Sequence, residues 1–273
     1  MDIQHARTFL FVPANRPERI DKALDAGADA VIVDLEDAVA PDAKDSSREA
    51  LSAWLETVSA RPVLVRVNGP ATPWYAADLA LCRHPTVAGL LLPKAETASA
   101  LAHAHIATGK PILPIVESAA GLHHLQQIAS APGCARLVFG KLDLAIDLRL
   151  EQGEEDSEEA VFQPYRAQLV LGSRLAGLPS PVEGVFTVLE DSTGLAAYAR
   201  RARRDGFGAL LLIHPRQAKI VATAFAPSAM EIAWARRVLL AAAEAGGSAA
   251  VVDGRMIDAP VIARAERLLV AAG

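Results

Sequence analysis

The chain has 273 residues, 52% of them hydrophobic, and a formal net charge of −5. This acidic balance disfavours binding to nucleic acid, which depends on neutralising phosphates with a basic surface. No uninterrupted apolar stretch approaches the roughly 20 residues that span a bilayer, and the first residues lack a signal-type apolar region. We therefore expect a cytoplasmic protein without a membrane partner.

Eight short apolar runs recur along the chain, and helical patterns separate them. This alternation is typical of βαβ units, and its near-regular repetition favours a closed TIM (β/α)8 barrel over an open doubly wound sheet. Such a barrel occupies about 250 residues, so one main domain can hold it. The predicted strands are Thr8–Pro13, Ala30–Leu35, Val63–Val67, Gly89–Leu92, Ile112–Val116, Arg136–Phe139, Val182–Phe186 and Ala209–Ile213.

Glycine and proline mark the ends of several helical patterns between these runs. The longest interruption lies between the sixth and seventh runs and contains the acidic stretch Glu151–Glu159, which we interpret as a solvated loop. The predicted helices are Pro17–Ala26, Ala43–Val58, Trp74–Cys82, Ala95–Thr108 and Gly121–Ala129.

The pattern changes after the eighth run, where two helical segments, Pro227–Ala245 and Ala259–Ala272, flank a short extended piece. We therefore predict a catalytic barrel at residues 1–226 and a C-terminal helical extension at residues 227–273. Gly246 and Gly247 offer a hinge between its parts. The extension is then either a lid or subunit-swapped arm, or a plain packing appendage.

Charged or polar side chains stand at the C-terminal ends of nearly all predicted strands. In a (β/α)8 barrel these ends open onto one face, where the active site is assembled. The sequence therefore predicts a functional site built from strand ends. These residues include Arg16, Glu36, Asp37, Arg66, Lys94, Glu117, Asp143, Asp191 and His214.

Two carboxylates follow neighbouring strands, since Glu117 ends the fifth run and Asp143 lies just past the sixth. Mg²⁺ prefers oxygen ligands and usually takes one or two carboxylates together with water. We therefore predict a Mg²⁺ site at Glu117 and Asp143, with Glu36 and Asp37 nearby. A salt bridge or a helix cap is the alternative role for a single carboxylate.

Each basic residue at the C-terminal ends of the predicted strands has two possible roles. Arg66 lies inside a buried strand and needs a paired anion, either a substrate carboxylate or an internal partner such as Glu36. Arg16 and Lys94 suit a phosphorylated ligand, or they are exposed loop charges. His214 is either a general base or a hydrogen-bonded structural residue.

Eight short stretches occur in an order that is similar to one known family, the citrate lyase β-subunit/malyl-CoA lyase (HpcH/HpaI aldolase) family of CoA-ester C–C lyases. The similarity runs from Arg7 to about Leu269. The stretches are residues 7–13 (RTFLFVP), 34–39 (DLEDAV), 65–68 (VRVN), 92–94 (LPK), 116–118 (VES), 139–144 (FGKLDL), 213–217 (IHPRQ) and 254–258 (GRMID).

The resemblance implies a Mg²⁺-dependent barrel that cleaves or forms a C–C bond beside a CoA thioester of the citryl-CoA or malyl-CoA type. It implies that Glu117 and Asp143 bind Mg²⁺ and that Arg66 holds the oxo or carboxylate group of the substrate. It also implies that Glu36 and Asp37 support the metal-bound waters.

The resemblance further implies that Asp258 is an acid/base supplied by the C-terminal lid of a neighbouring subunit. Arg16 and Lys94 would face CoA, and we group His214 with them at the cofactor-binding rim. The expected partners are a CoA thioester, a keto acid and further copies of the chain in a trimer or hexamer.

Three other functions stay open for this sequence. They are a Mg²⁺-dependent aldolase of free 2-keto acids, a malyl-CoA thioesterase and a non-catalytic acyl-CoA-binding subunit. Asp258 occurs together with both metal carboxylates, and this combination favours an enzyme over the binding subunit.

Overall fold

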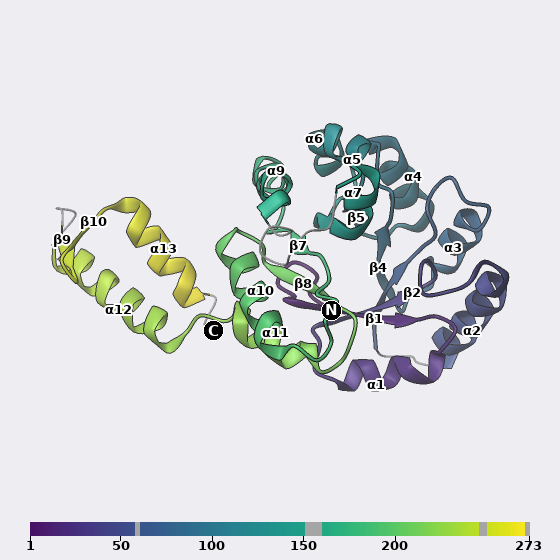
Figure 1. The fold of residues 1–273 in the computed structure, drawn as a ribbon, viewed down its shortest axis with the longest axis horizontal. Coiled ribbons are helices and arrows are strands. Elements are labelled where there is room, and N and C mark those ends of the chain that lie inside the picture. Colours follow the sequence, from purple (N-terminus) through teal and green to yellow (C-terminus); the bar gives the residue numbers. More distant parts are fainter. Residues whose placement is uncertain (58–60, 151–159, 246–249, 271–273) are drawn as a thin grey trace. The chain divides into compact units, whose positions relative to one another are not determined.

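A computed structural model describes residues 1–57, 61–150, 160–245 and 250–270. Its main feature is a closed barrel of eight parallel strands in sequential order, which confirms the predicted fold class (Figure 1). The expected acidic loop Glu151–Glu159 and the expected hinge at Gly246 and Gly247 lie outside the described residues. The strands are β1 (Thr8–Pro13), β2 (Ala30–Asp34), β3 (Val63–Arg66), β4 (Val87–Leu92), β5 (Ile112–Val116), β6 (Val138–Phe139), β7 (Val182–Glu183) and β8 (Ala209–Leu212).

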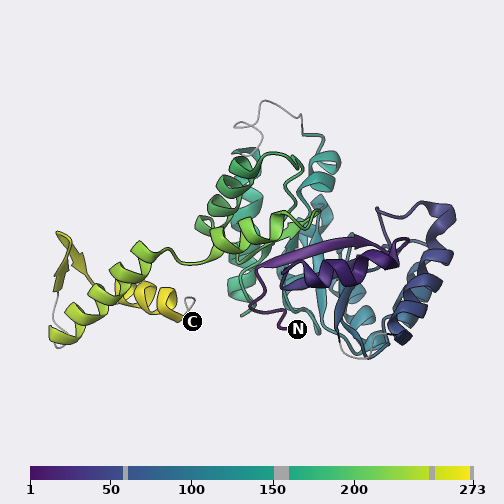
Figure 2. The same cartoon turned by 90° about the horizontal axis from the view of Figure 1, so that it is seen from below.

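Helices lie on the outside of this barrel (Figures 1 and 2). The helix expected at Gly121–Ala129 is divided into two, and α7, α9, α10 and α11 come in addition to the predicted helices. The helices that the structure describes around the barrel are η1 (Pro17–Arg19), α1 (Ile20–Asp25), η2 (Pro41–Ala43), α2 (Lys44–Thr57), α3 (Tyr75–Leu81), α4 (Ala98–Thr108), α5 (Ala119–His123), α6 (Leu125–Ala129), α7 (Lys141–Asp147), α9 (Gln163–Leu175), α10 (Ser192–Arg204) and α11 (Gln217–Phe225).

Local sequence signals explain where several helices begin and end. The Thr97 side chain accepts a hydrogen bond from the backbone N–H of Ala100 and caps α4, while Gly109 ends this helix in the left-handed region at φ 69°. Asp191 caps α10 in the same way as Thr97 caps α4. Such caps satisfy backbone groups that have no partner within the helix.

Alternate residues of the strands point into the barrel, because side chains on a strand change face at every step. Ile32, Leu64 and Ile115 belong to the buried cluster inside the barrel. The same alternation brings the residues two positions further along, Asp34, Arg66 and Glu117, to the inner face at the C-terminal ends of the strands. The periodicity that builds the core therefore also delivers charged groups to the mouth.

The chain divides into two compact units, Met1–Ala222 and Thr223–Gly273. In the second unit α12 and α13 pack through a small core of Ala235, Val238, Ile257 and Ala265. Within the described residues, no helix is long and apolar enough to cross a membrane. The elements of the second unit are α12 (Ala229–Glu244), the hairpin strands β9 (Ala250–Val252) and β10 (Arg255–Ile257), and α13 (Ala259–Val270).

Candidate active site

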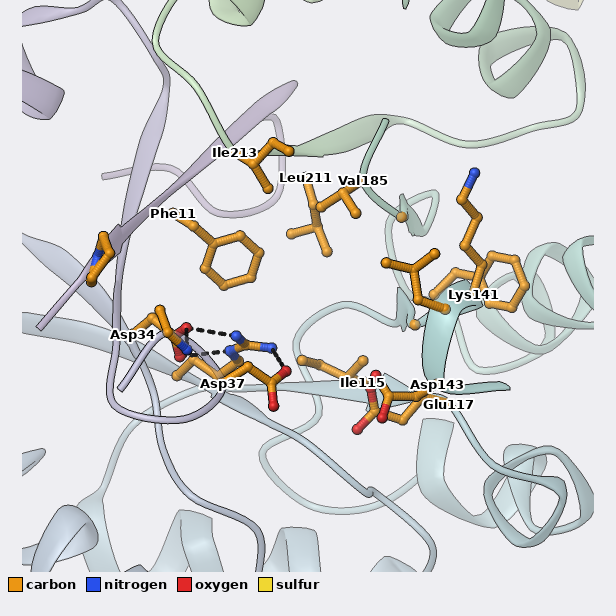
Figure 3. Close-up of a pocket in the computed structure, with 17 residues that line it drawn as sticks. Phe11, Asp34, Asp37, Ile115, Glu117, Lys141, Asp143, Val185, Leu211 and Ile213 are labelled. Atoms are coloured by element: carbon orange, nitrogen blue, oxygen red, sulfur yellow. Dashed lines mark hydrogen bonds and ion pairs between the residues drawn. The ribbon is translucent and has the colours of Figure 1, made fainter. Parts of the chain in front are cut away.

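A cavity of about 390 Å³ lies at the C-terminal ends of the barrel strands. Figure 3 shows Glu117 beside Asp143 on one side of it, with Phe11 and Leu211 across from them. The cavity therefore has an acidic side and an apolar side. Its lining consists of Phe11, Pro13, Asp34, Asp37, Ala38, Arg66, Ile115, Glu117, Phe139, Gly140, Lys141, Leu142, Asp143, Gly184, Val185, Leu211 and Ile213.

Arg66 pairs with three carboxylates of the β2 strand end. Asp34 and Arg66 face each other across the β2–β3 ladder, and Asp34 accepts both Nε, at 2.7 Å, and Nη2, at 2.6 Å. The Nη1 atom lies 3.0 Å from Glu36 and 3.1 Å from Asp37. Glu36, which the sequence suggested as an internal partner of Arg66, does contact it, and Asp34 and Asp37 are two further partners. The contact of Arg66 with substrate stays a prediction.

Asp34 is one of two residues near the site that the sequence analysis did not predict. Its side chain is buried, and it also accepts hydrogen bonds from the backbone N–H groups of Glu36 and Ala38. It therefore orients the Arg66 fork and shapes the turn that carries Glu36. Its position two residues after the inward-facing Ile32 is the signal that could identify it, because residues two apart on a strand share a face.

These charges influence one another strongly. Burial raises the pKa of Glu36 to about 8, against the opposing effect of Arg66. Burial also tends to lower the pKa of Arg66, but Asp34, Glu36 and Asp37 outweigh this effect and hold the pKa above its ordinary value. Arg66 is therefore a permanent cation with a fixed orientation at the cavity.

The predicted metal ligands lie next to each other with Lys94 between them. Glu117 is buried, and its Oε1 accepts the backbone N–H of Lys94 at 2.7 Å. The Lys94 ammonium contacts the carboxylate of Asp143 and lies 3.7 Å from Oε1 of Glu117. Burial raises the pKa of Glu117 to about 7. Gly140 leaves room for this arrangement, because a Cβ there would come within 2.5 Å of the Cβ of Glu117.

The donor set of Glu117 and Asp143 fits Mg²⁺. Both side chains offer carboxylate oxygens, and a cation, the Lys94 ammonium, already lies against both of them. In the described part of the chain, no group of three or more His, Cys, Asp or Glu side chains converges as a metal site. Two carboxylates are nevertheless a common share of a Mg²⁺ shell whose remaining positions are taken by water and substrate.

The other predicted rim residues take part in local contacts. Arg16 is exposed and pairs with Glu18 at 2.7 Å. His214 accepts the backbone N–H of Arg216 on Nδ1 at 3.1 Å. Neither Arg16 nor His214 belongs to the described cavity lining. Their contact with CoA stays a prediction.

Asp258 lies in the second compact unit, directly before α13. Its side chain is exposed, and Oδ1 accepts the backbone N–H of Val261 at 3.3 Å. In this structure Asp258 therefore caps the helix that follows it.

Lys44 at the start of α2 is a second residue that sequence reasoning missed. Its buried ammonium donates to the backbone carbonyl groups of Leu35, at 2.8 Å, and Glu36, at 2.7 Å. Asn68 donates to the same Leu35 carbonyl at 3.1 Å. These hydrogen bonds fix the backbone that follows β2 at Leu35 and Glu36, and so they help to position the Glu36 side chain.

Replacing Lys44 with methionine is expected to lower the free energy of unfolding by about 2 kcal/mol, because two buried carbonyl groups lose a charged donor. Urea denaturation followed by circular dichroism measures this loss. Lys22→Met on the exposed surface of α1 is the matched control and should change stability by less than about 0.5 kcal/mol. Equal stability of the two variants would show that the Lys44 hydrogen bonds contribute nothing.

The structure is a (β/α)8 barrel with a charged cavity at the C-terminal face, where enzymes of this fold carry their active sites. The family model "HpcH/HpaI aldolase/citrate lyase" matches residues 7–215, and the chain belongs to this family of enzymes.

Two relatives and one solved structure illustrate the similarity. A (3S)-malyl-CoA thioesterase of Cereibacter sphaeroides is 36% identical over 92% of this chain and 89% of its own length. The citrate lyase subunit beta of Leuconostoc mesenteroides is 32% identical over 96% of this chain and 92% of its own. The crystal structure of CitE from Mycobacterium tuberculosis with magnesium, acetoacetate and coenzyme A matches with a TM-score of 0.88 and 33% identity, covering 99% of this chain and 100% of that one.

Proposed function

We propose that the protein is a Mg²⁺-dependent carbon–carbon lyase of β-hydroxyacyl-CoA thioesters of the malyl-CoA or citryl-CoA type. The observation that carries this proposal is the convergence of Glu117, Asp143 and Arg66 on one cavity. Membership of the HpcH/HpaI aldolase/citrate lyase family supports it, and so does the similarity to a protein solved with magnesium and coenzyme A.

The chain's own residues account for the parts of this reaction. Glu117 and Asp143 would hold Mg²⁺, which supplies a Lewis acid for a substrate oxygen when it is bound. Arg66 offers a positive charge with a fixed orientation where negative charge develops on the substrate. Asp258 of a neighbouring subunit would accept the hydroxyl proton and return it to the thioester α-carbon as the bond between the two carbons breaks. The products are a carbonyl compound and a shortened acyl-CoA.

A panel of β-hydroxyacyl-CoA esters with Mg²⁺ tests the proposal. We expect malyl-CoA or citryl-CoA to yield acetyl-CoA together with glyoxylate or oxaloacetate, detected by liquid chromatography and a carbonyl reagent. Cleavage of free 2-keto acid aldols but of no CoA ester would instead support the aldolase. Binding of CoA esters without turnover would support the non-catalytic subunit.

Thioester hydrolysis is the second candidate, because several relatives at 35–36% identity are (3S)-malyl-CoA thioesterases. Hydrolysis releases free CoA thiol and malate, whereas the lyase reaction releases no thiol. A thiol reagent and the carbonyl assay on the same sample therefore separate the two activities. Release of free thiol without glyoxylate would refute the lyase proposal and support a thioesterase.

Mg²⁺ affinity is expected to increase as the pH rises from about 6 to 8. The pKa of Glu117 is raised to about 7, so the side chain carries a proton below this pH, and Mg²⁺ binds only its carboxylate form. The affinity should fall about tenfold for each pH unit below the pKa and level off above it. Calorimetric titration with MgCl₂ across this pH range measures the effect. A constant affinity would contradict the assignment of Glu117 as a ligand.

Asp258→Asn is expected to lower kcat by about 100-fold or more, because it removes the proposed proton-transfer group. Asparagine is also a good N-cap, so the contact with Val261 and the start of α13 should persist. Mg²⁺ binding by the variant, measured by calorimetry, should equal that of the wild type.

A mixing experiment tests whether Asp258 acts on a neighbouring barrel. Inactive Asp258→Asn and inactive Glu117→Gln proteins should regain partial activity after subunit exchange, since some sites then combine an intact barrel with an intact Asp258. Mass spectrometry verifies the exchange. Verified exchange without any recovered activity would place Asp258 in its own subunit's site or outside the mechanism.

A further inference from the structure

Lys94 has two unusual features at the same point of the barrel mouth. Its backbone lies in the left-handed region at φ 49°, which residues with a side chain rarely adopt. In this conformation its N–H donates to Glu117. Its ammonium reaches in the same direction and contacts Asp143 and Glu117. Strained backbone of this kind is concentrated at functional sites.

The ammonium has a physical reason to lie there. Glu117 is buried, and Asp143, with a side chain 41% exposed, is its neighbour. Two close carboxylates repel each other and disfavour the doubly ionised state unless a cation lies near both. The Lys94 ammonium is such a cation, since it contacts one carboxylate and lies 3.7 Å from the other. Lys94 therefore offsets the repulsion between the two carboxylates.

We infer that Lys94 competes with Mg²⁺ for the Glu117–Asp143 pair and so determines how tightly the protein binds the metal. This inference rests on the metal site of the proposed function. A Mg²⁺ ion that takes the Asp143 oxygen has to displace the Lys94 ammonium from it. The displaced ammonium remains on the same backbone position, close to the pair, where its charge repels the metal. Both effects weaken Mg²⁺ binding, so removal of the Lys94 charge strengthens it.

Calorimetric titration of the full chain with MgCl₂ alone tests this role without reference to activity. Lys94→Met removes the charge, keeps an unbranched side chain one atom shorter than lysine, and retains the backbone N–H that donates to Glu117. The variant should bind Mg²⁺ about tenfold more tightly than the wild type, or more. Lys94→Gln should behave in the same way, and Lys94→Arg, which keeps the charge, should bind no more tightly than the wild type. Lys141→Met removes a cation of the cavity lining and should change the affinity less than Lys94→Met.

Thermal unfolding provides a second readout. Without Mg²⁺, Lys94→Met should have a lower Tm than the wild type, because the carboxylate pair has lost its cation. Saturating Mg²⁺ should raise its Tm by more than it raises that of the wild type.

Equal or weaker Mg²⁺ binding by Lys94→Met, together with a folded circular dichroism spectrum, would overturn the role of Lys94 and leave the metal site standing. If neither the wild type nor any Lys94 variant bound Mg²⁺, the metal site of the proposed function would fail as well. Should Lys94→Met not fold, the comparison of Lys94→Gln with Lys94→Arg decides between the same outcomes.

Discussion

Glu117→Gln is expected to weaken Mg²⁺ binding by at least about 100-fold and to lower kcat by a similar or larger factor. Glutamine has the same shape as glutamate, but it lacks the negative charge. Its carbonyl oxygen can still accept the backbone N–H of Lys94, which donates to Glu117 at 2.7 Å. Glutamine is preferable to alanine here because the Glu117 side chain is buried and alanine would leave this N–H without its partner.

The measurement is calorimetric titration with MgCl₂, together with thermal unfolding to verify the fold. Asp143→Asn should give the same loss, because we propose that the two carboxylates bind one Mg²⁺ ion together. Glu18→Gln removes an exposed carboxylate that pairs with Arg16 and serves as the matched control. Wild-type affinity in both Glu117→Gln and Asp143→Asn would refute the metal assignment.

Arg66→Lys is expected to lower kcat/KM by about 100-fold or more. Lysine keeps the positive charge but loses the planar fork that contacts Asp34 through Nε and Nη2 and reaches Glu36 and Asp37 through Nη1. A single ammonium cannot reproduce all of these contacts, so the charge at the cavity would be displaced from the position where we propose that the substrate develops negative charge.

Steady-state kinetics on the best CoA ester measure this effect. Arg48→Lys is the matched control, because Arg48 also contacts two carboxylates, Asp78 through Nε and Asp45 through Nη1, but does not belong to the described cavity lining. The two variants should lose similar stability, while only Arg66→Lys should lose activity strongly. Unchanged kcat/KM in Arg66→Lys would make Arg66 a structural ion-pair partner alone.

The strands were predictable because strands buried on both faces appear as continuous apolar runs. The ends of the strands were harder to predict, because backbone hydrogen bonding to the neighbouring strand, rather than hydropathy, decides where a strand begins. The sixth run was expected to start at Arg136, but β6 begins at Val138. Arg136 instead donates from its buried guanidinium to the carbonyl groups of Ala6 and Ser180.

The site residues divide in the same way. Glu117 and Asp143 could be placed at one mouth from the sequence, since parallel strands bring their ends together. The ion-pair partners of Arg66 and Lys94 could not be predicted from the sequence, because these contacts join residues far apart in the chain. Arg66 meets Asp34 across 32 positions, and Lys94 meets Asp143 across 49. In the structure Lys94 contacts the predicted metal ligands, and its contact with CoA stays a prediction.

The sequence by itself determined the barrel and the face that carries its charges, because hydrophobic periodicity dictates which residues enter the core and parallel strands end on one side. Only the tertiary structure decided which charges meet and which protonation states they favour. Burial raises the pKa values of Glu36 and Glu117, and ion pairs orient Arg66 and Lys94. These effects depend on distance and on exclusion of water, which no local pattern of residues specifies.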